Sequence, residues 1–481
     1  MEHTGRIAII GAGIAGLCTA VYARKCGYEV DLFEQHERAG GLAISWRRGE
    51  YTFENSLVWL LGSRPGGLLH EQWREVFDID ALTFVDPDEY VRVETEDGDS
   101  LSMYRDIDRM EAELLRRAPG DADEIRRLAS MVRRVSTSAF PDPSERWPHA
   151  FLRMLRAVPL IPSLRWWSSL TLQEYSRRIN NPLLRRAIAG DESSTFSALV
   201  LVFPLVWMND RNAGYPIGGS QAVTDPIAAQ LQRLGGRLHC SASVTKILVE
   251  GDVARGVQLA DGQTFAADWV VSAADGHATV YELLGGRYTD AATDALYRTR
   301  ETFASYVHVA LGVNRELSQH GNSTIWVPQT PIRVDPGTTL PCVTMRFFNV
   351  DPTFAPPGKT ALTCVLPTRN VVYWTKLHDE DPARYNAEKE RVAQAVIASL
   401  EHAIPGIREA VDVVDVATPA TVIHYTRNWK GSMEGWLPAP GTSMTLPNTL
   451  PRLRGFYMAG QWVTPGGGFP SGLMSARRAL R

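Results

Sequence analysis

The chain opens with an apolar run, a stretch of helical composition and a second apolar run. Residues 7–10 are four consecutive apolar residues, as in a strand buried on both faces of a parallel sheet. Residues 17–26 favour a helix, and Gly27 suits the end of one. Residues 30–33 repeat the strand pattern. We therefore expect a strand–helix–strand unit at the start of the chain.

Glycines occupy the turn between the first expected strand and the helix, in the spacing G-x-G-x-x-G. The first suits a tight turn, the second lets the backbone approach a pyrophosphate, and the third lets the helix pack against the strand. An acid 23 positions after the first glycine matches the expected spacing of about 20 for a residue that binds ribose hydroxyls. The helix N-terminus would attract the phosphates. The pattern predicts a dinucleotide site at Gly11, Gly13, Ile14, Ala15, Gly16 and Glu34.

A second glycine pair follows the acidic end of the second expected strand. Residues 34–43 read Glu-Gln-His-Glu-Arg-Ala-Gly-Gly-Leu-Ala, so the backbone can approach the dinucleotide again. This segment resembles the extended fingerprint of the FAD-binding amine oxidase and phytoene desaturase superfamily. The resemblance implies FAD as the cofactor, with further contacts at Gln35, Arg38, Gly40, Gly41 and Leu42.

Near the C-terminus a strand-like segment leads into Pro465 and a glycine triplet, and then into a helix. Glycines let the backbone lie against a flat ring, and a helix N-terminus there would stabilise the negative charge of a reduced flavin. The motif closely resembles the C-terminal signature of phytoene desaturases, carotenoid isomerases and retinol saturases. Gln461 stands where other flavoproteins have an aspartate. The implied FAD contacts are Gly460, Gln461, Gly467, Gly468 and Phe469.

The resemblance extends to a segment in the middle of the chain that begins at Tyr215, and it implies cofactor contacts at Val244 and Ala273. It also implies an α/β fold with a discontinuous Rossmann-type FAD-binding domain and an inserted α+β substrate-binding domain. We assign residues 1–85, 215–298 and 426–481 to the first domain, and residues 86–214 and 299–425 to the second. The first half of the insert is expected to be largely helical, and the second half rich in strands.

The second half of the insert has strand-like pieces at 303–313, 340–350, 359–366 and 371–376, and a helical pattern at about 383–403. We expect this sheet to form one wall of an apolar pocket, helped by the aromatic residues Trp326, Phe347, Phe348, Tyr373 and Trp374. Residues 57–61 are expected either to form part of that wall or to pack in the core.

Two other apolar stretches, residues 151–170 and 198–208, mix aliphatic residues with tryptophan. We expect both to line a hydrophobic cavity or a dimer face. Peripheral contact with a membrane surface is the alternative, since arginine and tryptophan among aliphatic residues suit that interface.

Composition bears on the partners of the protein, on disulfides and metal sites, and on its location in the cell. The net charge of -4 argues against nucleic acid as the main partner. Five scattered cysteines without a C-x-x-C pair predict neither a disulfide framework nor a metal site. No run of about 20 apolar residues exists to span a membrane, and the first expected strand begins too early for a signal peptide. We expect a cytoplasmic protein, from a bacterium because arginine far outnumbers lysine.

The expected activity is that of an FAD-dependent oxidoreductase acting on carbon–carbon bonds of a hydrophobic polyene or isoprenoid-like substrate. Desaturation, saturation and isomerisation are variants of the same hydride chemistry, and NAD(P)H is a candidate electron donor. FAD is expected to be bound non-covalently, because no Cys or His stands in an evident attachment motif. The polar residues proposed for catalysis are Glu54, His424, Tyr425 and Arg427, with a structural role as the alternative for each.

Three other functions stay open at this point. A flavin amine oxidase would need a polar or acidic pocket entrance, which the aromatic, apolar insert disfavours. A non-catalytic prenyl or lipid carrier, like the GDP-dissociation inhibitors, would not need the intact glycines at both FAD contacts. A tailoring enzyme for a polyene natural product would use the same chemistry as a carotenoid enzyme.

Overall fold

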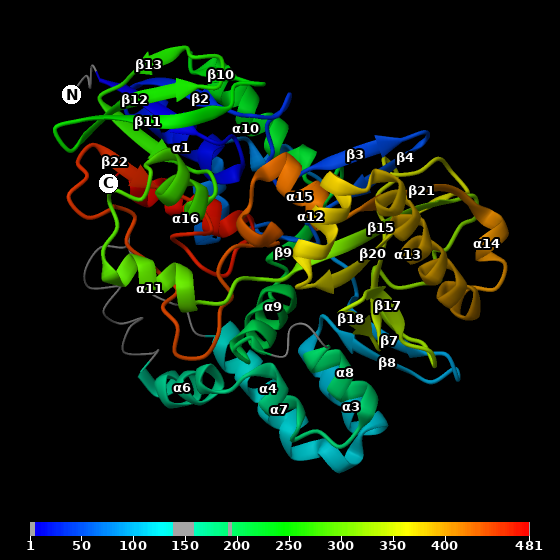
Figure 1. Ribbon diagram of the computed structural model, residues 1–481. Helices are drawn as coiled ribbons and strands as arrows, with labels where there is room; N and C mark the ends of the chain where they lie inside the picture. The colour runs from blue at the N-terminus through cyan, green and yellow to red at the C-terminus, as the bar shows by residue number, and fades with distance from the viewer. Residues whose placement is uncertain (1–4, 138–157, 191–194, 481) are drawn as a thin grey trace.

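Two β-sheets organise the protein, and helices cover them (Figure 1). The computed structural model describes residues 5–137, 158–190 and 195–480. The expected segment at 151–157 lies outside the described residues. In the described part of the chain, no helix is both long enough and apolar enough to cross a membrane.

The first sheet is parallel and has the strand order β10-β2-β1-β14-β22. Its strands come from three separate parts of the chain: β1 (Arg6–Ile10), β2 (Glu29–Phe33), β10 (Arg237–His239), β14 (Trp269–Ser272) and β22 (Phe456–Met458). One face packs against α1 (Ile14–Lys25), α10 (Gln221–Arg233) and α16 (Gly468–Ala479). The other face packs against an antiparallel sheet of β11 (Val244–Glu250), β12 (Val253–Leu259) and β13 (Thr264–Ala266). Both faces of β1 are therefore covered, which explains its unbroken apolar run.

The turn between β1 and α1 depends on an unusually close backbone contact. A Cβ atom placed on Gly16 would lie 1.8 Å from the carbonyl oxygen of Gly11. Gly11 itself has a φ of 88°, in the left-handed region that favours glycine. The two glycines therefore let the first turn of α1 lie directly against the end of β1, as the sequence predicts.

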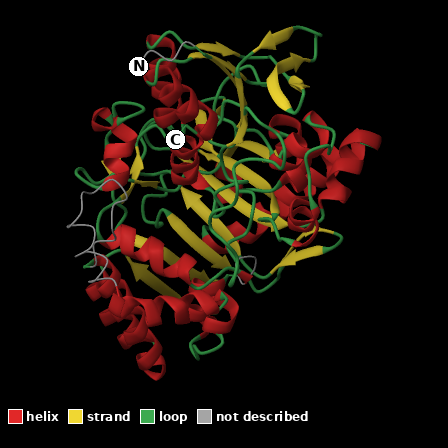
Figure 2. Ribbon diagram, turned by 90° about the vertical axis from the view of Figure 1, so that its left-hand side faces the viewer, coloured by secondary structure: helices red, strands yellow, loops and turns green. Residues whose placement is uncertain are grey.

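The second sheet has seven strands in the order β21-β15-β20-β19-β16-β7-β8. All neighbours pair antiparallel except β16 and β7. The strands are β7 (Glu89–Thr95), β8 (Ser100–Tyr104), β15 (Ser305–Val313), β16 (Ser323–Val327), β19 (Val343–Phe347), β20 (Thr360–Thr368) and β21 (Val411–Ala417). Figure 2 shows helices on both sides of these central strands. The hairpin β7–β8 joins the first half of the expected insert to the sheet of the second half.

Two helical layers cover this sheet. Helices α12 (Val371–Glu380) and α13 (Pro382–Ala403) pack on one face. The other layer, lowest in Figure 1, packs around β7 and β8. It consists of α3 (Ile107–Arg117), α4 (Ala122–Ser136), α6 (Ile161–Ser169), α7 (Leu172–Ser176), α8 (Pro182–Ala189) and α9 (Leu199–Asn209). The predicted α/β class, with a largely helical first half of the insert and a sheet-rich second half, matches this arrangement.

The remaining elements connect these layers. They are β3 (Ser45–Arg48), β4 (Tyr51–Glu54), β5 (Leu60–Leu61), β6 (Phe84–Val85), β9 (Ala213–Pro216), β17 (Ile332–Asp335), β18 (Thr338–Leu340), α2 (Leu68–Arg74), α11 (Ala291–Thr299), α14 (Ile407–Ala410), α15 (Pro419–Thr426) and the short turns η1 (Ile79–Ala81), η2 (Pro119–Asp121), η3 (Val158–Leu160), η5 (Ala278–Leu283) and η6 (Trp429–Gly431).

The expected strand at 371–376 is wrong, because this segment forms the start of α12. Its β-branched and aromatic residues suggest a strand, but helical spacing buries Trp374 and Leu377 on one side. Trp374 then lies edge-on to Tyr385 of α13, with ring centroids 6.3 Å apart. Tertiary packing has overridden the local preference.

Substitution of Gly16 tests the contact between β1 and α1. In Gly16→Ala the methyl group would overlap the Gly11 carbonyl oxygen, so α1 must move away from the strand. We expect the free energy of unfolding to fall by about 1–3 kcal/mol or more, measured by urea denaturation of the cofactor-free protein. Gly120→Ala is the matched control, because nothing lies within 4 Å of its Cβ position. Equal stability of the two variants would contradict the proposed packing role.

Candidate functional site

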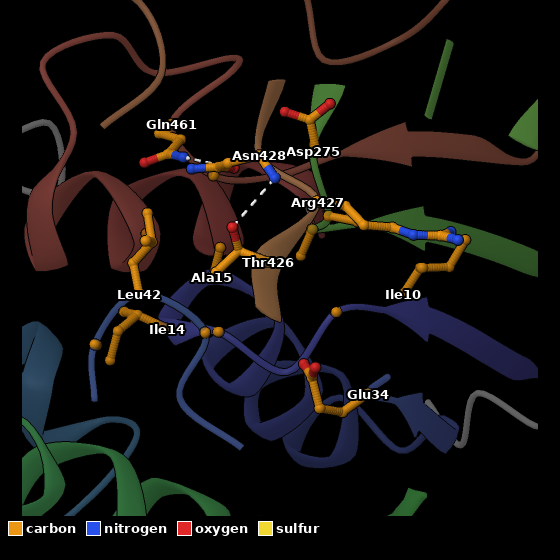
Figure 3. A pocket seen from close by; sticks show the side chains of 18 of the residues that line it. Ile10, Ile14, Ala15, Glu34, Leu42, Asp275, Thr426, Arg427, Asn428 and Gln461 are labelled. Carbon is orange, nitrogen blue, oxygen red and sulfur yellow. Dashed lines mark hydrogen bonds between the residues drawn. The ribbon is translucent and has the colours of Figure 1, made fainter. Parts of the chain in front are cut away.

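A cleft opens at the carboxyl ends of β1, β2 and β14, where the turns after these strands meet. Figure 3 shows Glu34 at one side of the opening, and Gln461 and Asn428 at the other. Of the residues predicted to contact the cofactor, most line this cleft. These are Gly11, Gly13, Ile14, Ala15, Glu34, Gln35, Gly40, Gly41, Leu42, Val244, Ala273, Gly460, Gln461, Gly468 and Phe469.

One end of the cleft is built from the N-terminus of α1 and from Glu34. Helix α1 begins after Gly13, and no side chain caps its first turn. Its free N–H groups and partial positive charge can therefore receive phosphate oxygens. The buried carboxylate of Glu34 accepts hydrogen bonds from the backbone N–H of Ala12 at 2.8 Å and of His36 at 3.0 Å. These bonds fix the carboxylate beside the turn, where it can also accept hydrogen bonds from ribose hydroxyls.

The second glycine pair lies against the first turn. Gly13 and Gly40 form an isolated parallel bridge, and the N–H of Gly40 donates to the carbonyl of Ala12 at 2.9 Å. A Cβ atom on Gly41 would lie 3.2 Å from the Cα of Gly13. The two segments therefore form one bare backbone surface, which leaves room for a dinucleotide.

The other end of the cleft is formed by the C-terminal glycine triplet. Gly466, Gly467 and Gly468 have φ values of 97°, 61° and 73°, all in the left-handed region. The chain then enters α16, whose first turn has no side-chain cap. A Cβ atom on Gly467 would lie 2.4 Å from the Cβ of Glu434, so this glycine lets Glu434 approach the helix N-terminus. Nearby, the side-chain amide of Gln461 donates to Asn428 at 3.3 Å.

Three predicted cofactor residues, Gly16, Arg38 and Gly467, do not line the cleft. Gly16 and Gly467 shape its walls from behind through the close contacts described above. Arg38 lies in the turn before Gly40 and only partly exposes its side chain.

Glu54, a predicted catalytic residue, is fully buried and does not line the cleft. Its carboxylate accepts five hydrogen bonds: from the hydroxyls of Ser45 and Ser220, and from the backbone N–H groups of Ser220, Ser56 and Leu57. The distances range from 2.7 Å to 3.2 Å. This geometry favours the structural alternative, in which Glu54 ties β4 to the segment that enters α10.

The other three predicted catalytic residues lie together at the end of α15. The side chains of Tyr425 and Arg427 reach the cleft, whereas His424 is exposed and outside it. The carbonyl of Tyr425 accepts a hydrogen bond from the Gln35 side chain at 2.8 Å, and its ring lies edge-on to His36. These residues therefore stand beside the Glu34 end of the cleft, a position suited to contacts with the dinucleotide.

A second cavity, of about 400 Å³, adjoins the cleft and is mostly apolar. Met433 lines both hollows, so the cavity and the cleft are neighbours at this residue. The expected stretches at 57–61 and 198–208 contribute Val58 and Trp59, and Val200, Leu201 and Met208 of α9. The other large apolar and aromatic side chains of its wall are Tyr90, Val91, Leu172, Ile188, Phe196, Phe303, Ile325, Leu340, Val365, Pro367 and Leu437.

The aromatic residues predicted for this wall are absent from it. Strand residues alternate between the two faces of a sheet. In the described part of the wall, β16, β19 and β20 each contribute two residues that are two positions apart and so share a face: Ser323 and Ile325, Thr344 and Arg346, and Val365 and Pro367. Trp326, Phe347 and Trp374 pack in the core under α12 and α13, with Tyr373 against it. Phe348 packs in a separate cluster with Tyr51 and Phe53. The sheet does form one side of the cavity, but with its other face.

Two charged side chains that the sequence analysis missed line the two hollows and attract each other electrostatically. Arg346 of β19 lines the apolar cavity, and Glu434 lines the cleft. Burial lowers the pKa of Arg346, against the attraction of Glu54 and Glu434. Burial also raises the pKa of Glu434 to about 7, although Arg346 opposes this shift. The alternating pattern of β19 was a usable signal, since it places a cation on the face opposite Met345 and Phe347.

Asp275, just after β14, is another missed residue of the cleft. Its carboxylate accepts the backbone N–H groups of Ala278 at 2.7 Å and Trp429 at 2.8 Å. Burial outweighs these bonds and raises the pKa of Asp275 to about 7. Trp429 in turn stacks on His277 with centroids 4.8 Å apart, so Asp275 links the turn after β14 to the segment after α15.

The cleft fits the FAD that the sequence resemblance implies. It offers an uncapped helix N-terminus and a carboxylate at one end, bare glycine backbone along its floor, and a second uncapped helix N-terminus at the other end. In the described part of the chain, no three His, Cys, Asp or Glu side chains come together in a way that could hold a metal ion.

Comparison with known proteins supports this assignment. Residues 14–479 match the family described as flavin containing amine oxidoreductase. The lycopene-forming phytoene desaturase of Pseudescherichia vulneris is 26% identical, over 98% of this chain and 97% of that protein. The chloroplastic prolycopene isomerase of Arabidopsis thaliana is 24% identical, over 98% of this chain and 82% of that protein. These relatives confirm the predicted resemblance to desaturases and carotenoid isomerases.

Solved structures show the same fold. An oxidoreductase from Methanosarcina mazei matches with a TM-score of 0.63 at 18% identity, over 99% of both chains. Putrescine oxidase bound to putrescine matches with a TM-score of 0.62 at 14% identity, over 99% of this chain and 98% of that one. Because the family match extends over nearly the whole sequence, this chain belongs to the flavin containing amine oxidoreductase family and is an FAD-dependent oxidoreductase.

Proposed function

We propose that the protein acts on carbon–carbon bonds of a hydrophobic polyene or isoprenoid-like substrate by desaturation, saturation or isomerisation. The observation that carries this proposal is the apolar cavity that meets the cofactor cleft at Met433. The phytoene desaturases and prolycopene isomerases among its relatives support the same chemistry.

In this proposal the cleft holds FAD non-covalently. The Gly11 turn and the N-terminus of α1 bind the phosphates, Glu34 binds the ribose, and the glycine triplet before α16 lies against the flavin ring. Bound FAD supplies the hydride chemistry. The chain's own residues orient the substrate and exclude water, since the walls of the cavity are mostly apolar.

The domain boundaries given above belong to this proposal, with residues 1–85, 215–298 and 426–481 holding FAD and the two inserted segments forming the cavity. Cytoplasmic location, peripheral contact with a membrane surface, and NAD(P)H as the electron donor stay predictions.

Amine oxidation is the second candidate, because the family description names it and a putrescine oxidase shares the fold. Arg346 disfavours it, since a protonated amine would enter a cavity that already holds a positive charge. A non-catalytic lipid carrier would have no use for the bare glycine surface of the cleft.

The visible spectrum of the purified protein under anaerobic conditions tests the proposed function. We expect flavin absorbance that is bleached either by a polyene, supplied as a hydrocarbon such as phytoene or as a polyene carboxylic acid, or by NAD(P)H. Bleaching by the polyene indicates desaturation, and bleaching by NAD(P)H followed by reoxidation with the polyene indicates saturation. Bleaching by amines alone would overturn the proposal in favour of amine oxidation, and a protein without flavin would favour the carrier.

Glu34→Ala tests the cofactor site. The substitution removes an acceptor for the ribose and also the bonds that hold Ala12 and His36 in place. We expect the dissociation constant for FAD to rise at least about tenfold, equivalent to 1.4 kcal/mol, in a fluorescence titration of the cofactor-free protein. Glu37→Ala is the control, because Glu37 is exposed and outside the cleft. Unchanged FAD binding in Glu34→Ala would reject the assigned ribose contact.

Glu434→Gln tests the buried carboxyl group beside the flavin end of the cleft. In the folded protein, burial raises the pKa of Glu434 to about 7, against 4.5 for an ordinary glutamate. Wild-type stability should therefore fall relative to the variant as pH rises from 4.5 to 7, and the difference should level off above pH 7. The expected change is about 3 kcal/mol in the free energy of unfolding.

Urea denaturation of the cofactor-free proteins at pH 5 and pH 8 measures this change. The exposed residue Glu409 supplies the control variant Glu409→Gln, for which no such pH dependence is expected. A constant difference between wild type and Glu434→Gln at both pH values would show that the carboxyl group is not held protonated by burial.

A further inference from the structure

Arg346 is a cation in the wall of a mostly apolar cavity, and Glu434 of the neighbouring cleft attracts it electrostatically. Its strand places it on the same face as Thr344, and both line the cavity. No hydrogen bond or ion pair joins its guanidinium to any residue that the structure describes. An unpaired charge removed from bulk water is costly, and protein interiors rarely hold one without a partner.

The two nearby carboxyl groups do not supply that partner. Glu54 attracts Arg346 electrostatically, but its oxygens are already taken by the five hydrogen bonds described above. Glu434 also attracts Arg346, yet no ion pair within 4.0 Å forms between them, and burial favours its neutral form. The guanidinium therefore keeps its donors directed at the cavity.

Other polar atoms without a partner surround Arg346 on the same face of the sheet. Thr363 pairs with it in register on β20, is fully buried, and has a hydroxyl with no hydrogen-bond partner. His308 lies opposite Val365, which lines the cavity, and its ring nitrogens make no hydrogen bond to another side chain. Burial lowers the pKa of His308 to about 3, and Arg346 lowers it further, so this ring is neutral. The wall itself is lined here by Arg346, Thr344 and Ser323, and Thr363 and His308 lie buried on the same face of the sheet.

A pure hydrocarbon would fit this place poorly. It would displace water from the guanidinium and return no hydrogen bond, which leaves a buried charge without compensation. A carboxylate would do the opposite, because it accepts two parallel N–H bonds from one guanidinium and neutralises its charge.

We propose that the substrate is an apolar polyene or isoprenoid-like chain that carries a carboxylate, and that Arg346 binds this carboxylate where the cavity meets the cofactor cleft. The hydroxyl groups of Thr344 and Ser323 lie on the same wall and complete the polar end. The apolar chain extends along Trp59, Tyr90 and Phe196. The bond that reacts is then close to the carboxylate, since Arg346 lies within electrostatic reach of Glu434 in the cofactor cleft. This inference rests on the proposed function and narrows its substrate class.

Binding of cis-parinaric acid, a fluorescent polyene fatty acid, tests the inference on the flavin-loaded protein. Its methyl ester is the matched ligand without a charge. We expect wild type to bind the acid at least tenfold more tightly than the ester. In Arg346→Gln the acid should lose at least tenfold in affinity, while the ester binds as well as before or better. Arg346→Lys keeps the charge but not the paired donors, and should retain part of the preference.

Arg333→Gln is the matched control, because Arg333 is exposed on β17 and does not line the cavity. The flavin content of every variant shows whether it has folded. Equal binding of acid and ester by wild type, an unchanged preference in Arg346→Gln, or no binding of either ligand would each overturn the inference. A different result would overturn the proposed function: a purified protein without flavin, or a flavin that responds to amines alone. The titration of the Arg346 variants is independent of that result, because it measures binding and not turnover.

Discussion

The site depends on the contact between the first turn of α1 and the end of β1. No side chain larger than hydrogen can stand at Gly16, because its Cβ would meet the carbonyl oxygen of Gly11. This closeness places the uncapped N-terminus of α1 at the carboxyl edge of the parallel sheet. The strands beside β1 then bring Glu34, the turn after β14 and the strand before Gly460 to the same edge. A dinucleotide can bind there because parallel strands end together.

The second organising feature is the boundary between the cofactor cleft and the apolar cavity. Segments distant in sequence lie at this boundary. Charged side chains there either join two segments by hydrogen bonds or line one of the two hollows. Glu54 fastens β4 to the segment before α10 with five hydrogen bonds, which makes it a structural residue. Glu434 lines the cleft, Arg346 lines the cavity, and burial disfavours the charged form of both. Burial therefore favours the neutral form of Glu434, whereas the guanidinium of Arg346 stays charged.

The comparisons and the cavity answer different questions. Family membership and the shared fold establish an FAD-dependent oxidoreductase, and this scaffold serves both amine oxidases and carotenoid enzymes. The residues that line the cavity therefore have to distinguish an amine oxidase from a carotenoid enzyme. The walls of the cavity are mostly apolar, and Arg346 is their one charged residue in the part that the structure describes. This pattern disfavours a cationic amine and a bare hydrocarbon for the same electrostatic reason, since neither can neutralise a buried guanidinium.

The sequence by itself determined the features that depend on local backbone geometry. Glycines mark the positions where the chain turns tightly or passes close to another backbone. In the structure these are residues 11, 13, 16, 40, 41, 460 and 466–468. The apolar run at residues 7–10 predicted a buried parallel strand, because a strand covered on both faces has no polar side. Most strands of the insert and the long helix α13 were predictable from their periodicity.

Only the tertiary structure decided which side chains meet. Arg346, Glu434 and Glu54 lie far apart in sequence, and no spacing relates them, so their approach depends on how the two sheets are placed. The sequence also could not predict which face of the second sheet lines the cavity. Both faces of this sheet are covered, and alternation along a strand does not distinguish a face packed in the core from a face that lines a cavity. The helix at 371–380 formed against its β-like composition because Trp374 finds its partner on α13. Long-range packing has no local signature, and here it determined which residues line the apolar cavity.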